Sequence, residues 1–535
     1  MTEQEEYAER PVPRQARLGF AKPALVWAGF AYAYICIFIG SQIMGGLGAP
    51  LGYVAIISGQ IFLFVYSGLI AHKGAALGLN FSLMCKAAFG KYGYAAPVLL
   101  IAGLVTGWFA FQGWLAGDLT VGLYGGKSFN AGTGSGILPG IFGTTAFWGA
   151  IWTATFGIFA VYGIRAMAWM GRFAVVSVTV LAAWMIYSIL TVVASGTGGN
   201  PLISHPVGHP WTFALGFTAS IGTFIVSSTM TGDFTRWTKN TKQAWGVTAV
   251  AFPICNLLML MVGGIFTAVA GKLDFFFGLA AIGLGIPIMI IQWASNGSTC
   301  DGCMYNATQG FKNVSYNISK GKFNLSWKKI ASIVVLVGAG VAAANLLTSI
   351  VPWLLLLGTV VSLVGGVLIG HFWVVARKST PDEILAAADR IVNIPAIIGL
   401  LVGIVIAVII AVAVPDLPAV IGGLIGGVGV YPAVARYMGY TKGGRLTDKG
   451  IGVSIDSVTG ASSTSEVEDQ HRSRDTSDES TSTRTSDIYD NDNMNSNSKY
   501  VAGIFHNLEK IVQLLAPYWF SSSSSSSNMR RGGLS

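Results

Sequence analysis

The sequence predicts an all-α, polytopic membrane protein that crosses the bilayer twelve times. Of its 535 residues, 53% are hydrophobic and only 11% are charged, whereas about a quarter of the residues of a soluble protein are charged. Apolar segments of roughly 20 residues, long enough to cross about 30 Å of hydrocarbon, recur along the chain. Such segments are too long for barrel strands, and a helix satisfies its own backbone N–H and C=O groups. The predicted spans are 25–47, 53–76, 95–124, 137–163, 168–194, 211–230, 243–270, 279–300, 329–349, 351–376, 392–414 and 417–436.

The distribution of positive charge predicts that both ends of the chain are cytoplasmic. Lysine and arginine near span ends are retained on the cytoplasmic side. The N-terminal arm, residues 1–24, and every second loop carry several of them, whereas the opposite loops carry only Lys127 and Lys272. The net charge of +9 therefore reflects topology and does not indicate a nucleic-acid partner. The polar first 24 residues do not resemble a cleavable signal, so we expect a multi-pass protein of the cell membrane.

Two short motifs receive structural interpretations. Cys300 and Cys303 form a C-x-x-C pair, but no further His or Cys lies nearby in the sequence, so small residues at a helix end are favoured over a metal or redox site. Four N-x-S/T sequons fall within residues 306–326 and would mark an external loop if they were glycosylated. Five lysines between residues 312 and 329 favour a cytoplasmic loop instead.

A change of composition near residue 441 predicts that the membrane domain spans residues 25–440. Ser, Thr, Asp, Glu and Asn dominate from there to residue 499 without an apolar period, which is typical of a disordered tail. Residues 501–520 carry apolar side chains at helical spacing that polar residues interrupt. This pattern favours an amphipathic helix on the membrane surface over a thirteenth span. Residues 441–535 are therefore predicted as a disordered cytoplasmic tail.

Polar side chains within the spans are few and therefore informative, since a polar group in the membrane is costly unless it faces protein or a watery cavity. Trp108 and Gln112 are spaced i, i+4 and share one helix face. They combine a flat apolar surface with an amide that donates and accepts, which suits a flat heterocycle. The alternative is that Trp108 packs and Gln112 bonds a neighbouring helix. Trp114 and Asp118 are interpreted as structural.

The first and sixth spans are poor continuous helices. The first ends in a glycine-rich stretch between Gly40 and Gly48, and the sixth reads LGFTASIGTFIVSSTMTGDFTRW. Broken first and sixth helices are what a five-plus-five inverted repeat produces, here with two additional helices, although glycines of this kind also serve helix packing. The eighth span ends in IIQWASNGSTCDG, which is rich in side-chain oxygens. Hard cations such as sodium prefer hydroxyl and carbonyl oxygens.

Seven short motifs occur in order along residues 10–440: PVP (11–13) with Arg17, TGWF (106–109), GTF (222–224), TGDFTRW (231–237), WASN (293–296), VGGVLIG (364–370) and VNIPAI (392–397). Together they resemble the motifs of the nucleobase:cation symporter-1 family and, within it, those of the bacterial cytosine permeases most closely. The resemblance implies a broken-helix, inverted-repeat fold.

The resemblance also implies a secondary active transporter that imports a cytosine-like nucleobase by cation symport through alternating access. A permease of the same family for a purine, allantoin, hydantoin, thiamine or pyridoxine is the first alternative. A transporter-like nucleobase sensor that signals through the tail is the second. An enzyme is not expected, because the sequence contains no nucleophile–base or metal constellation. The expected partners are the base, a coupling cation and membrane lipid, with no cofactor and no obligate protein partner.

By the family's pattern, the rings of Trp108 and Phe224 sandwich the base, which supplies affinity with little hydrogen-bond specificity. The resemblance places the cation between the first helix, near Gly29 and Ala33, and the eighth helix, at Ala294 and Ser295. Sodium is the expected ion and a proton is the alternative. The residues expected to read the edge of the base are Gln112, Thr223, Gln292 and Asn296.

Several positions depart from the cytosine permease pattern. Ile291 stands at an asparagine position, Val226 at a serine and Ala33 at a phenylalanine, so the base need not be cytosine. Ala294 replaces a threonine and removes one hydroxyl ligand, which weakens the assignment of sodium against a proton. His371 replaces an acidic residue in the tenth helix, where it is either a packed neutral residue or a contributor to proton coupling.

Overall fold

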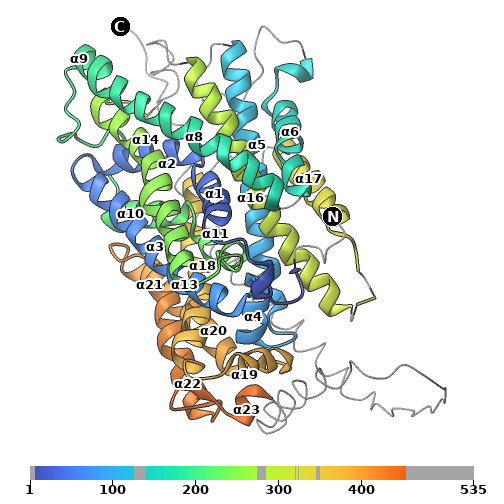
Figure 1. Ribbon diagram of the computed structural model, residues 1–535. Helices are drawn as coiled ribbons and strands as arrows, with labels where there is room; N and C mark the ends of the chain where they lie inside the picture. Colours follow the sequence, from blue (N-terminus) through green and yellow to red (C-terminus); the bar gives the residue numbers. More distant parts are fainter. Residues whose placement is uncertain are drawn as a thin grey trace, which may run out of the picture. The chain divides into compact units, whose positions relative to one another are not determined.

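A computed structural model of the protein describes residues 7–125, 140–162, 164–273, 285–319, 321–322, 324–344 and 350–452. The chain divides into two compact units, Met1–Ser462 and Ser463–Ser535, and every described residue belongs to the first. Nearly all of its elements are helices (Figure 1). The amphipathic helix predicted at 501–520 lies outside the described residues.

Each of the twelve predicted spans coincides with a helix or a run of short helices. Among the described residues, seven helices are long and apolar enough to cross a membrane, and the bent pair α1 and α2 brings the number to eight. The predicted all-helical, multi-span fold is thereby confirmed. The helices of the spans are α1 (Ala21–Ala31) with α2 (Ile35–Leu47), α3 (Leu51–Leu77), α5 (Ala95–Gly125), α6 (Thr145–Phe156) with α7 (Ile158–Val161), α8 (Ile164–Ser188) with η4 (Ile189–Val193) and α9 (Ala194–Thr197), α10 (Phe213–Gly222) with α11 (Ile225–Thr229) and α12 (Gly232–Thr235), α13 (Thr241–Ala249) with η5 (Val250–Asn256) and α14 (Leu257–Ala270), α16 (Gly285–Ile318), α17 (Trp327–Ala343), α18 (Ile350–Gly370) with η7 (His371–Val375), α20 (Ile394–Ala413), and α21 (Val420–Leu424) with η9 (Ile425–Val430) and α22 (Tyr431–Tyr437).

Shorter elements connect these spans. They are η2 (Arg14–Ala16), α4 (Phe81–Phe89), η3 (Gly140–Gly143), α19 (Pro381–Ala386), η8 (Ala387–Asp389), β1 (Thr441–Lys442), β2 (Arg445–Leu446) and α23 (Asp448–Ile451). The α4 helix begins where the side chain of Asn80 accepts a hydrogen bond from the Leu83 amide, a typical N-cap. β1 and β2 form a small antiparallel hairpin.

The first and sixth spans are broken, as their composition predicts. α1 and α2 meet at an angle of 52°, and residues 32–34 between them are not helical. α10 ends at Gly222 and α11 begins at Ile225. A break frees backbone carbonyls that must find other donors. At the first break, the hydroxyl of Thr299 donates to the Phe30 carbonyl at 3.1 Å, and Ser295 donates to the Tyr32 carbonyl.

The predicted end of the eighth span at residue 300 is wrong, because α16 continues to Ile318. Asn306 and Asn313 lie beyond residue 300 and are fully buried, and the Asn313 amide donates to the carbonyl of Ala8 at 2.8 Å. A polar residue that finds a partner within the protein, as Asn313 does, does not end a helix. Cys300 and Cys303 therefore lie inside α16 and not at its end, and the buried side chains of Asn306 and Asn313 leave no room for a glycan in this fold.

The folded part also extends beyond the boundary predicted at residue 440. Leu446 is 2% exposed and Ile451 is fully buried. The buried guanidinium of Arg390 donates to the carbonyl of Gly450, and Arg445 Nε donates to a carboxylate oxygen of Glu383 at 2.9 Å. Residues 441–452 therefore pack against the membrane domain, because tertiary partners compensate for their polar composition.

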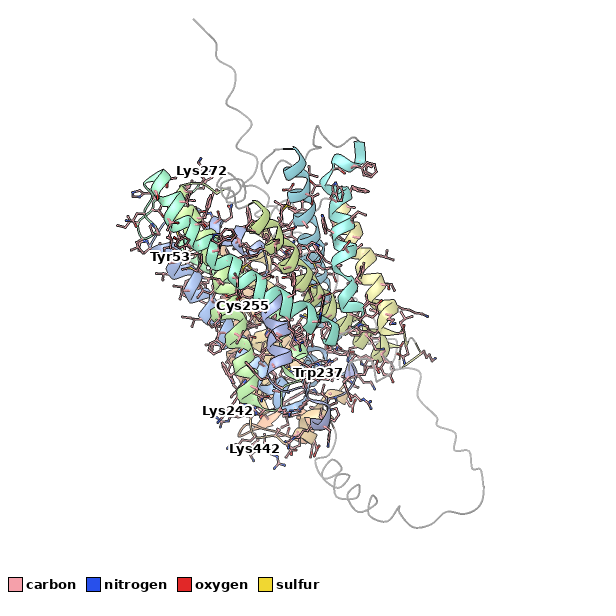
Figure 2. The ribbon with its side chains drawn as sticks, turned by 45° about the horizontal axis from the view of Figure 1, so that its top comes forward. Tyr53, Trp237, Lys242, Cys255, Lys272 and Lys442 are labelled. Carbon is pink, nitrogen blue, oxygen red and sulfur yellow. The ribbon has the colours of Figure 1, made fainter. Side chains whose placement is uncertain are left out.

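Lysines from the two predicted classes of loop lie at opposite ends of the helices. Figure 2 shows Lys272, from a loop predicted to be external, at one end of the helices. Lys242 and Lys442, from segments predicted to be cytoplasmic, lie at the opposite end (Figure 2).

Candidate functional site

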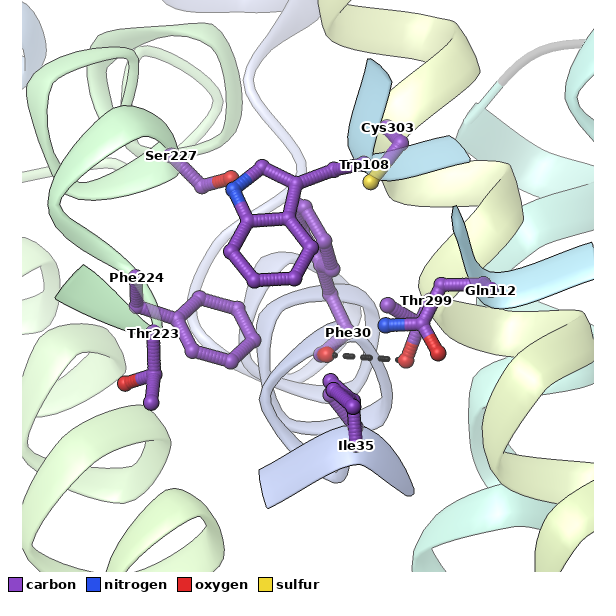
Figure 3. Close-up of a pocket in the computed structure, with 10 residues that line it drawn as sticks. Phe30, Ile35, Trp108, Gln112, Thr223, Phe224, Ser227, Thr299 and Cys303 are labelled. Carbon is purple, nitrogen blue, oxygen red and sulfur yellow. Dashed lines mark hydrogen bonds between the residues drawn. The ribbon is translucent and has the colours of Figure 1, made fainter. Parts of the chain in front are cut away.

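A small cavity lies where the broken first and sixth spans meet α5 and α16 (Figure 3). Its volume is about 10 Å³, which is room for about one water molecule. A planar ring therefore enters only when the enclosing side chains move apart. The lining residues are Phe30, Ala33, Ile35, Trp108, Gln112, Thr223, Phe224, Ser227, Thr299 and Cys303.

Trp108 and Gln112 provide the polar groups that face this cavity from α5. They are 4% and 1% exposed, and the spacing of one helical turn puts both on the same side of α5. The indole Nε1 of Trp108 and the Oε1 of Gln112 are buried without a hydrogen-bond partner among the described residues. Buried polar groups are nearly always paired, because an unpaired one costs free energy. One donor and one acceptor are therefore available to a ligand at this site.

Phe224 lies at the break in the sixth span and lines the cavity. Its backbone at φ −136° and ψ 6° is not helical, and its ring packs edge-on against Phe30 at a centroid distance of 5.4 Å. Trp27 and Phe252 hold the same ring at 6.0 Å each. Thr223, next to it, also lines the cavity, and its hydroxyl donates to the Ser220 carbonyl at 2.7 Å. The break thus directs an aromatic ring toward α5, whereas the Thr223 hydroxyl is turned back to the backbone of its own span.

Asn296 and Gln292 approach the site from α16 without lining the cavity as it stands. The amide of Asn296 donates to the backbone carbonyl of Gln112 at 3.2 Å, so the two residues are neighbours. Gln292 lies one turn earlier on the same helix and is 6% exposed. Asn296 Oδ1 and Gln292 Nε2 are also buried without a partner in the described part of the chain.

The four residues assigned to the cation lie at the contact between the first span and α16. Gly29 packs so closely that an added Cβ would lie 2.4 Å from the hydroxyl of Ser298. Ala33 lies in the break itself and lines the cavity, and Ala294 is fully buried. Ser295 donates to the carbonyl of Tyr32. The oxygens gathered here are neutral hydroxyls and carbonyls, which suit a hard monovalent cation.

Within the described ranges, no group of three or more His, Cys, Asp or Glu side chains could hold a metal ion. His371 is fully buried, and its Nδ1 lies 2.8 Å from the hydroxyl of Tyr431. It does not belong to the described lining of the cavity. Asp118 accepts a hydrogen bond from Thr145 at 3.3 Å, in agreement with its structural interpretation.

Sequence reasoning missed five lining residues. Thr299 and Cys303 follow Asn296 at i+3 and i+7, a spacing that puts all three on one helix face and that offered a usable signal. Phe30, Ile35 and Ser227 had no such signal, because the breaks alone decide which of their neighbours face the cavity.

Comparisons with known proteins agree with this architecture. Residues 11–428 match the family described as permease for cytosine/purines, uracil, thiamine, allantoin. The cytosine permease of Escherichia coli strain K12 is 26% identical over 438 residues, which cover 82% of this chain and 96% of that protein. Two solved structures of Mhp1 share the fold at 18% identity. The closed form with bromovinylhydantoin bound has a TM-score of 0.64 and covers 80% of this chain and 94% of that one. The inward-facing form has a TM-score of 0.62 and covers 81% and 93%.

The family match spans most of the chain, and the broken helices form the expected crossing around the cavity. The protein is accordingly a multi-pass membrane transporter and not an enzyme, and the chain belongs to the nucleobase:cation symporter-1 family of permeases for cytosine, purines, uracil, thiamine and allantoin.

Proposed function

We propose that the protein imports a nucleobase or a closely related planar heterocycle together with a cation by alternating access. The observation that carries this proposal is the pair of unpartnered buried groups, Trp108 Nε1 and Gln112 Oε1, in one cavity. A heterocycle can stack on the face of the indole and donate a hydrogen bond to the amide oxygen of Gln112. The Trp108 N–H points in the plane of its own ring and therefore pairs with a separate acceptor at the edge of the indole.

The choice of a nucleobase rests on ring chemistry and on the relatives. The cavity has aromatic and aliphatic walls with a few polar atoms, as sites for small planar molecules do. The Escherichia coli relative is a cytosine permease, and one structure of Mhp1 holds a hydantoin. Both names describe flat rings with carbonyl and N–H groups at their edges. Cytosine is the first substrate to test, and other bases are its competitors.

Sodium is the coupling ion in this proposal. Ser295 and the freed carbonyl of Tyr32 are in direct contact, and a sodium ion between them replaces the hydrogen bond with two oxygen ligands. Binding of the ion therefore changes the contact between α16 and the first-span break. Since the same break carries Ala33 into the cavity wall, occupation of the cation site and the shape of the base site are linked.

If the cavity is to open toward the cytoplasm, a connected set of side-chain contacts must separate. Phe30 in the cavity wall packs on Phe234 at 5.9 Å, and Phe234 stacks on Tyr305 at 5.8 Å. The Tyr305 hydroxyl accepts from Arg236 at 3.3 Å, and the same guanidinium donates to the carbonyl of Tyr7 at 2.8 Å. These contacts close the path from the cavity toward the end that carries Lys242, which faces the cytoplasm in this proposal.

Uptake by the purified full-length chain in liposomes tests the proposal. Labelled cytosine is supplied outside, with an inward sodium gradient, an inward proton gradient, both or neither. Unlabelled cytosine, uracil, adenine, hypoxanthine, allantoin, hydantoin, thiamine and pyridoxine then compete at fixed pH. Concentrative uptake driven by sodium and inhibited by one of these rings supports sodium symport. Uptake that only the proton gradient drives would reassign the ion.

The same assay separates transport from sensing. A nucleobase sensor binds the ring, as equilibrium dialysis detects, but accumulates no label against a gradient. Binding without accumulation under any gradient would overturn the transport proposal and favour the sensor. Neither binding nor accumulation for any ring of the panel would remove planar heterocycles as the substrate class.

A further inference from the structure

We propose that Ser227 and Cys303 form, with the indole N–H of Trp108, a second recognition subsite that binds a hydrogen-bond acceptor on the ring, such as a carbonyl oxygen. This inference rests on the proposed function and deepens it. It names the residues that contact a second edge of the heterocycle, other than the edge that Gln112 contacts. The subsite restricts which ring substituents the transporter accepts.

The two residues reach the cavity from different helices. Ser227 projects from α11 and is 4% exposed, and Cys303 projects from α16 and is 2% exposed. Figure 3 shows the indole nitrogen of Trp108 turned toward Ser227 and Cys303 beside the opposite end of the same side chain, whereas Gln112 lies next to Thr299. The cavity therefore has two polar ends.

The indole nitrogen is the independent sign of a ligand at this end. Trp108 is 4% exposed and lines the cavity, yet its Nε1–H has no acceptor among the described residues. An indole nitrogen only donates, a serine hydroxyl donates or accepts, and a thiol is a weak donor. The indole N–H can therefore pair only with an acceptor on the ligand, and the Ser227 hydroxyl and the Cys303 thiol add two further donors along the same wall of the cavity.

Cys303 differs in this respect from the other cysteine of its C-x-x-C pair. The sulfur of Cys300 lies 3.9 Å from the backbone carbonyl of Phe109 on α5, and Cys300 is not among the described lining residues. Both thiols are buried and free. The helix thus turns one cysteine toward α5 and the other into the cavity, which makes Cys300 a matched control.

Discrimination between paired heterocycles tests the hydrogen-bonding part of the subsite. Uracil is compared with 2-pyrimidinone, and hypoxanthine with purine, since the members of each pair differ by a ring carbonyl and the N–H beside it. Inhibition of labelled uptake and equilibrium binding are measured for wild type, Ser227→Ala and Cys303→Ala. Loss of one hydrogen bond is expected to reduce the preference for the carbonyl-bearing ring by about 2- to 12-fold in Ser227→Ala. A uniform loss of affinity for all rings would overturn the subsite.

Alkylation tests the placement of Cys303 without a transport readout. Full-length protein in membranes is treated with N-ethylmaleimide, and the modified cysteines are identified by mass spectrometry. Cys303 is expected to react as the cavity opens and to be protected by the rings that bind. Cys300→Ala is expected to leave the protected reaction unchanged, and Cys303→Ala to abolish it.

The outcomes distinguish this subsite from the proposed function. Protection of Cys303 without accumulation of label would keep the subsite and overturn transport. Accumulation of label with no protection of Cys303 would keep transport and overturn the subsite. No alkylation of Cys303 in actively transporting protein would also overturn it, because a subsite residue becomes accessible whenever the cavity opens.

Discussion

Replacing Trp108 by alanine is expected to weaken base binding by about 5- to 150-fold while α5 remains helical. The indole is 4% exposed, lines the cavity and keeps its N–H free. Loss of one base–aromatic stack costs about 1–3 kcal/mol, which corresponds to that range of affinity. Loss of the unpartnered donor moves the result toward the upper end for rings that carry an acceptor. Trp108→Phe retains a ring without the N–H and is expected to recover part of the affinity.

Trp114→Ala is the matched control for this change. Trp114 lies on the same helix, is 8% exposed and packs on Phe111 at a centroid distance of 5.5 Å, but it is not part of the described cavity wall. Truncation of either buried indole lowers the free energy of unfolding by about 3–5 kcal/mol. Thermal unfolding in detergent is therefore expected to shift similarly in both variants.

Equilibrium binding of labelled base, measured well below the unfolding temperature, then separates the two roles. Only Trp108→Ala is expected to raise the dissociation constant. Equal dissociation constants in wild type and Trp108→Ala would refute the stacking role. Equal weakening in Trp108→Ala and Trp114→Ala would show that a loss of packing, and not a lost contact with the base, explains the result.

Three further predictions concern the cation and the C-terminal segment. Ser295→Ala should raise the sodium concentration for half-maximal uptake more than it changes base affinity at saturating sodium, because the hydroxyl that contacts the Tyr32 carbonyl is lost; sodium titrations that match wild type would contradict this. Truncation after residue 452 should leave uptake intact. Truncation after residue 440 removes the buried Leu446 and Ile451, whose burial contributes about 3–6 kcal/mol together, and should lower the yield of folded protein. Equal yields from the two truncations would contradict the packing of residues 441–452 against the membrane domain. Burial raises the pKa of the Glu383 carboxyl, but hydrogen bonds from Arg445 and the Thr380 amide outweigh it and hold the pKa below its usual value. The stabilisation is thus present above the ordinary glutamate pKa of about 4.3 and lost as the pH falls through the lowered value, so that limited proteolysis should release residues 441–452 faster in acid, and Glu383→Gln should abolish that pH dependence.

Local patterns were enough to predict the helices and half of the site. A span must satisfy its backbone within its own sequence, so hydropathy alone located the helical segments, and glycine with small polar residues marked the two breaks. Trp108 and Gln112 share a face because of the helical period, and the structure has both in the cavity wall. These features depend on residues within a few positions of one another.

The remaining features depend on partners far away in the chain. α16 continues past residue 300 because Asn313 bonds to Ala8, 305 residues away, and residues 441–452 fold because Gly450 meets Arg390. The composition near residues 301 and 441 by itself predicts a loop or a disordered segment. The partners that order these residues lie far away in the sequence, where a reading of neighbouring residues does not find them. Ser227 and Cys303 face one cavity for the same reason. Four spans meet there, and the close packing of helices at the breaks, which hydropathy does not encode, selects the side chains that point inward.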